Sequence, residues 1–156
     1  MLGSPDPDRQ VQPQIQGCTC GRLRRLTRKI TAIYDRALAP CGLRVTQFSL
    51  MSSLSKLQAP TLAELAESMD MERTTLLRNL RPLVAAGWVR VEARAHSRRQ
   101  EARLTPAGHA KWAQARRFWR VAQNAVNSTL GESEVERLHR RVDRYLSQLR
   151  SPEERE

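Results

Sequence analysis

The chain has 156 residues, of which 40% are hydrophobic, and carries a formal net charge of +11 at pH 7. This length suits one domain that buries a core without disulfides or a structural metal. No run of 18 apolar residues occurs, which argues against a transmembrane helix and against a membrane partner.

The basic residues are 24 arginines and three lysines. This balance favours a polyanionic partner, because basic surfaces bind phosphate backbones by Coulomb attraction and counterion release. The same excess also fits an arginine-rich composition whose solvated charges are spread over the whole surface. Charge alone therefore leaves nucleic-acid binding open.

Residues 1–17 predict a disordered tail, because Pro, Gln and Asp are abundant there and the basic start and apolar stretch of a secretory signal are missing. Without such a signal, and with only three cysteines, we expect reduced thiols and a cytoplasmic location. Residues 18–156 are expected to form a single domain.

Apolar residues at three- and four-residue spacing predict a first helix over residues 21–38. Thr46 is expected to cap a second helix. Thr61 and Glu64 have the spacing of a capping box, in which each side chain satisfies a backbone amide of the other, and this box begins a short third helix.

A fourth helix is predicted over residues 72–86, with Gly87 at its end. Pro82 should bend this helix, since proline removes an amide donor and crowds the preceding turn. The positions expected to face inward are Leu76, Leu77, Leu80, Leu83 and Val84.

Alternation of apolar and polar residues predicts strands over residues 88–92 and within 100–104, joined by a basic loop. A long helix over residues 106–130 follows, because Thr105 can cap it and Pro106 suits its first position. A second capping box, at Ser133 and Glu136, predicts the last helix.

The predicted order is four helices, two strands and two helices, a mainly α chain with a small β-ribbon. Residues 44–105 match a winged helix-turn-helix lobe. Residues 18–43 and 106–150 leave amphipathic helices at both chain ends, whose apolar faces need cover. A two-fold partner supplies it, so we expect a homodimer.

The second helix of a helix-turn-helix pair fits the major groove of double-stranded DNA and presents side chains to base edges. Arg pairs with guanine, Asn pairs with adenine, and Thr contacts bases or phosphates. An ordinary solvated helix face is the alternative. The expected contacts on this helix are Arg73, Thr74, Thr75, Arg78 and Asn79.

The basic loop adds three candidate contacts, Arg94, Arg98 and Arg99, which are expected to clamp phosphates or to enter the minor groove. Residues 72–103 contain eight arginines against three glutamates, so positive charge is concentrated in this segment. The alternative is that these charges only keep the loop solvated.

The sequence resembles the MarR family of bacterial transcriptional regulators over about residues 23–149. The segments that carry the resemblance are Thr46-Gln47-Phe48, Leu62-Ala63-Glu64-Leu65-Ala66, Arg73-Thr74-Thr75-Leu76-Leu77-Arg78, Gly87-Trp88-Val89 and Leu104-Thr105-Pro106-Ala107-Gly108. The resemblance implies a homodimer built from the first and last two helices, with a winged helix-turn-helix on each lobe and a palindromic operator. One position departs from the family pattern: His96 stands where an Asp commonly precedes the wing arginine, here Arg98, by two residues.

We therefore expect a sequence-specific DNA-binding regulator, and specifically a repressor, because occupying a promoter needs only DNA binding and dimer geometry. The alternative is a nonspecific or architectural nucleic-acid-binding protein. Glycine-rich phosphate loops, a nucleophile elbow and metal motifs are absent from the sequence, so we expect no enzyme, no cofactor and no metal site.

Cys18 and Cys20 lie where the tail meets the first helix, and helix amides and nearby arginines favour a thiolate there. Such a thiolate suits an oxidant sensor, and some members of the resembled family sense oxidants through an N-terminal cysteine. Residues two apart bridge only under strain, so a disulfide to Cys41 or between two chains is expected. Inert cysteines are the alternative, and two sulfurs supply only half of a zinc shell.

The resemblance also implies a small aromatic or amphipathic effector bound between the terminal helices and the lobe. Aromatic and methionine residues at helical spacing are equally typical of an ordinary core. The candidate lining residues are Tyr34, Arg36, Phe48, Met51, Trp112 and Trp119.

Overall fold

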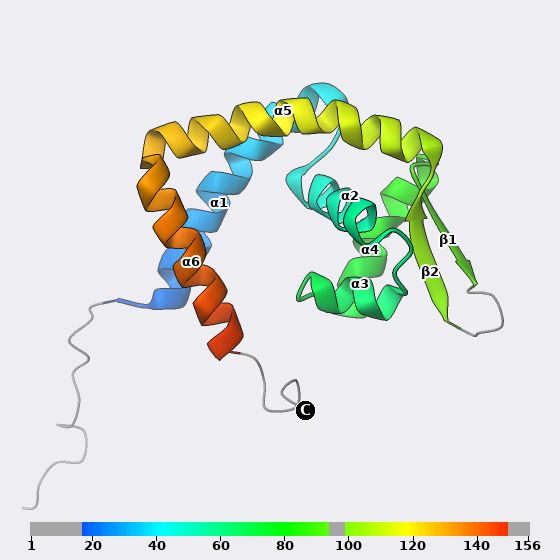
Figure 1. Ribbon diagram of the computed structural model, residues 1–156, viewed down its shortest axis with the longest axis horizontal. Coiled ribbons are helices and arrows are strands. Elements are labelled where there is room, and N and C mark those ends of the chain that lie inside the picture. The colour runs from blue at the N-terminus through cyan, green and yellow to red at the C-terminus, as the bar shows by residue number, and fades with distance from the viewer. Residues whose placement is uncertain (1–16, 94–98, 150–156) are drawn as a thin grey trace, which may run out of the picture.

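The computed structural model describes residues 17–93 and 99–149 (Figure 1). The expected tail, apart from Gly17, and the loop residues Arg94, His96 and Arg98 lie outside this part of the chain. The elements are the helices α1 (Thr19–Leu38), α2 (Val45–Leu57), α3 (Leu62–Ser68), α4 (Arg73–Ala85), α5 (Pro106–Leu130) and α6 (Glu132–Gln148), the 3-10 turn η2 (Ala39–Cys41), and the strands β1 (Val89–Ala93) and β2 (Gln100–Leu104). The predicted order and fold class are confirmed.

Figure 1 shows α5 spanning the molecule. At one end lies a lobe made of α2, α3, α4 and the β1–β2 hairpin, and at the other end lie α1 and α6. The two strands are antiparallel, with Val89 opposite Leu104 and Ala93 opposite Gln100. The chain thus consists of a lobe and a pair of terminal helices, joined by one long helix.

The start of α2 differs from the prediction, because Thr46 is not its cap. The helix begins at Val45 with Arg44 as its N-cap, two residues before the predicted cap, and the N–H of Arg44 donates to Oε1 of Gln47 at 2.9 Å. Asp35 of α1 accepts from the N–H of Val45 at 2.7 Å. A carboxylate from another helix therefore satisfies an amide of the first turn, and sequence spacing within α2 cannot reveal it.

The capping box at the start of α3 is confirmed: the N–H of Glu64 donates to Oγ1 of Thr61 at 3.2 Å, and the N–H of Thr61 donates to Oε2 of Glu64 at 2.7 Å. The box predicted for α6 is wrong. That helix begins at Glu132 after Gly131, which has no side chain to cap it, and the carbonyl of Gly131 accepts from the N–H groups of Glu134 and Val135.

Helix α4 continues through Pro82 to Ala85. Pro82 is exposed, and because it has no N–H it donates no helical hydrogen bond to the carbonyl of Arg78; the helix ends three residues later. Gly87 follows with a φ of 71°, and the N–H of Trp88 donates to the carbonyl of Leu83, which terminates the helix as predicted.

The inward face of α4 is narrower than predicted. Leu76, Leu80 and Leu83 are buried, but Leu77 and Val84 are each 42% exposed. The reason is that these two residues lie on the flank of the helix beside the hairpin, where they line a shallow groove together with Val91.

The larger of two apolar clusters fills the lobe, and Ala115 of α5 is fully buried in it. The smaller cluster lies between α1 and α5 and contains Tyr34, Ala122 and Val126. Because α5 contributes to both clusters, it holds the lobe at a fixed place relative to α1.

The terminal helices keep large apolar side chains at the surface of the single chain. They are Leu23, Leu26 and Ile33 of α1, Val142, Tyr145 and Leu146 of α6, and Leu149 just beyond it. An exposed apolar surface of this kind is typical of an interface between protein chains.

Candidate nucleic-acid interface

The exposed face of α4 places the candidate base-reading residues. Thr74, Arg78 and Arg81 are exposed at helical spacing and follow one line along the helix, which we call the outer line of α4. Thr75 is only half-buried and lies off this line. Arg81 was not among the predicted contacts, although it lies seven residues after Thr74 and three after Arg78, which is the spacing of one helix face.

Asn79 has a different place from the one expected. It is half-buried, and its amide nitrogen donates to Sδ of Met71 at 3.6 Å. A side chain engaged with the loop before α4 supports the position of this helix and does not face outward with Thr74 and Arg78. We therefore remove Asn79 from the candidate base readers.

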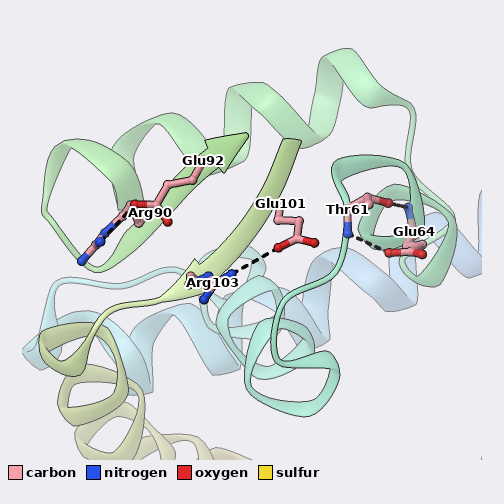
Figure 2. Close-up of polar contacts among 6 residues, drawn as sticks. All are labelled: Thr61, Glu64, Arg90, Glu92, Glu101 and Arg103. Carbon is pink, nitrogen blue, oxygen red and sulfur yellow. Dashed lines mark hydrogen bonds and ion pairs between the residues drawn. The ribbon is translucent and has the colours of Figure 1, made fainter. Parts of the chain in front are cut away.

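The hairpin beside α4 is held to the helical part of the lobe by backbone and side-chain contacts. The N–H of Ala102 donates to the carbonyl of Pro60 at 3.0 Å, and Thr61 forms an isolated bridge with Glu101. Figure 2 shows these neighbours: the capping box of Thr61 and Glu64 lies beside Glu101 of β2. The start of α3 and the hairpin are thereby fixed to each other.

Two ion pairs lie along the hairpin (Figure 2). Arg90 is paired with Glu92 at 3.0 Å, and Arg103 with Glu101 at 3.1 Å. Both arginine side chains are about half exposed, so each pair contributes little to stability.

Of the three loop arginines predicted to clamp phosphates, Arg99 lies in the described part of the chain and is exposed.

The base of the hairpin is joined to the start of α5. Oγ1 of Thr105 donates to the carbonyl of Gly87 at 2.7 Å and accepts from the N–H of Gly108 at 3.0 Å. The N–H of Thr105 donates to the carbonyl of Trp88. Gly108 packs so closely on Trp88, the residue before β1, that a Cβ at Gly108 would lie 1.9 Å from the Trp88 carbonyl oxygen. Only glycine permits this approach of α5 to the backbone of Trp88.

A crevice lies between α2 and α5, with a volume of about 340 Å³ and lining residues Phe48, Ser52, Trp112, Arg116 and Trp119. Phe48 and Trp119 stack with ring centroids 5.8 Å apart. Nε1 of Trp112 donates to Oγ of Ser52 at 3.0 Å, and the Arg116 guanidinium lies 5.5 Å from the Trp112 ring centroid. The crevice thus combines aromatic walls with one cation and one hydroxyl.

Three of the six residues predicted for the effector site, Phe48, Trp112 and Trp119, line this crevice. Met51 is fully buried in the lobe core, and Arg36 is exposed and does not line it. Tyr34 packs behind Trp119 with ring centroids 6.3 Å apart and donates to Gln123 at 2.7 Å. Burial raises the pKa of the Tyr34 hydroxyl above its ordinary value. The prediction missed Ser52 and Arg116.

Cys18 and Cys20 lie at the start of α1, and Cys41 lies beyond its other end, in η2. Cys18 caps the helix, since its Sγ accepts from the N–H of Gly21 at 3.5 Å, and both Cys18 and Cys20 are exposed. Cys41 is buried, and its Sγ donates to the carbonyl of Leu38 at 3.0 Å. A 20-residue helix spans about 30 Å, so a bridge from Cys18 or Cys20 to Cys41 of the same chain is excluded in this fold.

Within residues 17–93 and 99–149, no group of three or more His, Cys, Asp or Glu side chains is placed to hold a metal ion. None of the helices in these ranges has the length and apolar composition needed to cross a membrane.

Comparison with known proteins places the chain in a family. The model of the MarR family matches residues 43–100. The transcriptional regulator MosR of M. tuberculosis, solved in complex with DNA, is 37% identical over 86% of this chain and all of that one, with a TM-score of 0.74. No curated protein matches.

Two more distant structures share the fold. A cysteine-to-serine mutant of E. coli MarR in complex with operator DNA is 24% identical over 81% of this chain and 92% of that one, with a TM-score of 0.74. Bordetella bronchiseptica BpsR, described for the regulation of its DNA binding by 6-hydroxynicotinic acid, is 18% identical over 86% of this chain and 98% of that one, with a TM-score of 0.75. The family match, the identity to MosR and the shared architecture together establish that this chain belongs to the MarR family.

Proposed function

We propose that the protein is a transcriptional regulator that binds double-stranded DNA by sequence and represses by occupying a promoter. The observation that carries the proposal is the outer line of α4, where Thr74, Arg78 and Arg81 are exposed on the second helix of a helix-turn-helix. Arg and Thr are residues that read base edges in the major groove. The structures of MosR and E. coli MarR with DNA support the same role here. The protein acts by binding, without catalysis, and in the cytoplasm.

Selection of bound duplexes from random DNA tests this function. A sequence-specific dimer enriches one palindromic motif whose half-sites are about one turn, or 34–36 Å, apart. A nonspecific or architectural protein, the alternative function, enriches no motif and binds all duplexes with an affinity that salt governs. Absence of an enriched motif for the native protein would therefore refute the proposed function.

The homodimer is part of this proposal. The exposed apolar residues of α1 and α6 support it, because a second copy can cover both helices at once. Sedimentation equilibrium of the full chain at micromolar concentration is expected to give twice the monomer mass of 17.8 kDa. A monomer at that concentration would refute the two-fold arrangement.

A small aromatic acid is proposed as the effector of the crevice between α2 and α5. Phe48 and Trp119 offer apolar walls, and Arg116 and Ser52 offer partners for a carboxylate and a hydroxyl. Arg116 also lines an adjoining hollow with Arg117 and Arg120, which adds positive charge beside the crevice.

Thermal shift with 6-hydroxynicotinic acid and with benzoate tests this effector class. Binding to the folded protein should raise Tm, and the rise should vanish in Arg116→Ala but persist in Arg144→Ala, which removes an arginine from α6. No rise with any aromatic acid, or an equal rise in both variants, would reject the crevice as the effector site.

A redox switch at the exposed cysteines is the second proposed route of regulation. Because Cys18 and Cys20 cannot reach Cys41 in one chain, the disulfide has to join two chains. Mild peroxide should give a covalent dimer on a non-reducing gel and weaken DNA binding, and Cys18→Ser with Cys20→Ser should abolish both effects. Unchanged DNA binding after oxidation would leave the cysteines inert.

A further inference from the structure

A hollow of about 650 Å³ opens where three elements of the lobe meet: the start of α3, the start of α4 and the end of the hairpin. Arg73, the first residue of α4, lines it from one element, and Arg99, which precedes β2, lines it from another. Both arginines are exposed. Two cations that are 26 positions apart in the sequence thus share one concave surface.

The place of this hollow matches the path of a DNA strand. If α4 enters the major groove and the hairpin approaches the adjacent minor groove, the two elements straddle the sugar-phosphate strand that separates the grooves. Helix α4 packs against β1, so the sugar-phosphate strand has to pass over the place where the helix and the hairpin meet. The hollow lies there, beside the first residue of α4 and the open end of the hairpin.

Two carboxylates, those of Glu64 and Glu67 of α3, also line the hollow. Glu64 stabilises the start of α3, because its Oε2 accepts from the N–H of Thr61. Glu67 is exposed one turn further along. Like-charge repulsion disfavours an anion next to these two carboxylates, so a phosphate in the hollow has to bind next to Arg73 and Arg99.

We infer that this hollow seats one phosphate of the DNA backbone between Arg73 and Arg99. The inference rests on the proposed function and changes the role that the sequence analysis gave to Arg73. At this position Arg73 holds the backbone and sets the register of α4, while Thr74, Arg78 and Arg81 face the bases. Arginine suits such a contact, because its planar guanidinium donates two parallel hydrogen bonds to phosphate oxygens.

The salt dependence of binding distinguishes a phosphate contact of Arg73 from a base contact. Affinities of the native chain and of the variants Arg73→Gln, Arg73→Lys and Arg144→Gln are measured from low to high salt, on a duplex selected by the native protein and on a scrambled duplex. The slope of log K against log salt concentration is negative, and losing one phosphate contact makes it shallower by about 0.9 in each lobe. Arg73→Gln should show this loss and weaken binding to both duplexes by the same factor. Arg73→Lys should keep the slope, and the distant Arg144→Gln controls for net charge.

Two results would refute the binding of a DNA phosphate between Arg73 and Arg99. One is an Arg73→Gln variant with an unchanged salt slope, and the other is a variant that loses affinity for the selected duplex alone, which marks a base contact. Failure of the proposed function looks different, because the native protein itself then selects no motif. The salt slope on scrambled DNA still tests Arg73 in that case.

Discussion

The contact between α5 and the hairpin predicts a large effect of one methyl group. In Gly108→Ala the new Cβ would lie 1.9 Å from the carbonyl oxygen of Trp88 and 2.9 Å from its carbonyl carbon. Both atoms belong to the backbone, and this oxygen already accepts from the N–H of Thr105, so a rotamer change cannot relieve the clash. Strand β1 and helix α5 must move apart by roughly 1 Å or more, well beyond ordinary adjustment of a packed interior.

The magnitude follows from two opposing effects. Overpacking costs about 3 kcal/mol at the upper end of its usual range, which applies because backbone is displaced. Replacing a helical glycine by alanine returns up to about 1 kcal/mol through lower entropy of the unfolded chain. The net loss of about 2 kcal/mol corresponds to a Tm lower by about 4–8 °C for a chain of this size.

Gly21 provides a matched control within α1. A Cβ at Gly21 would meet only Cβ of Cys18, at 3.8 Å, so Gly21→Ala should be neutral or raise stability by up to about 1 kcal/mol. Both variants are melted at the same protein concentration, because assembly makes Tm depend on concentration. A Gly108→Ala variant as stable as the native protein would refute the close approach of α5 to the backbone of Trp88.

Three further predictions concern separate parts of the molecule. Thr61→Ala should lower the free energy of unfolding by about 1 kcal/mol, as measured by urea titration, since it removes the cap of α3; no loss would mean that the capping box does not stabilise the lobe. Tyr34→Phe should cost about 0.5–1.5 kcal/mol at pH 7 through the lost hydrogen bond to Gln123. Because the raised pKa means that the folded state holds the Tyr34 proton more tightly, native stability should also fall as the pH rises through about 10, and Tyr34→Phe should lack that part of the fall; identical pH profiles would contradict it. Leu146→Glu should weaken dimerisation by about 10²–10⁴-fold in sedimentation equilibrium, since each buried leucine contributes about 1.5–3 kcal/mol and the two-fold axis counts it twice; an unchanged dimer would show that α6 lies outside the interface.

Local chemistry made most of the elements predictable. The capping box at Thr61 and the Thr105-Pro106 pair fixed the starts of α3 and α5, and Gly87 fixed the end of α4, because each is a contact within a few residues. The predictions failed where a residue distant in the sequence determines how a helix begins or which of its side chains are buried. Asp35 of α1 satisfies an amide at the start of α2, and the hairpin flanks Leu77 and Val84, so neither feature is visible in local spacing.

The sequence predicted several residues of the candidate site, but not how these residues are grouped in space. Helical spacing identified Thr74 and Arg78, but it could not separate Asn79, which contacts Met71, from the outward residues. Nothing in the local spacing indicated that Arg73 and Arg99 line one hollow, or that Ser52 and Arg116 join Phe48 and Trp119 in one crevice. Such groupings depend on how the helices and the hairpin pack.

The most direct test of sequence reading by α4 is the ratio of affinities for the selected and the scrambled duplex, measured at one salt concentration for the native protein and for Arg78→Ala. If Arg78 contacts a base, the variant should lose about 1–3 kcal/mol per lobe on the selected duplex and much less on the scrambled one, so the ratio falls. If the variant loses affinity for both duplexes by the same factor and the ratio stays at its native value, the outer line of α4 does not read the bases and the account is wrong.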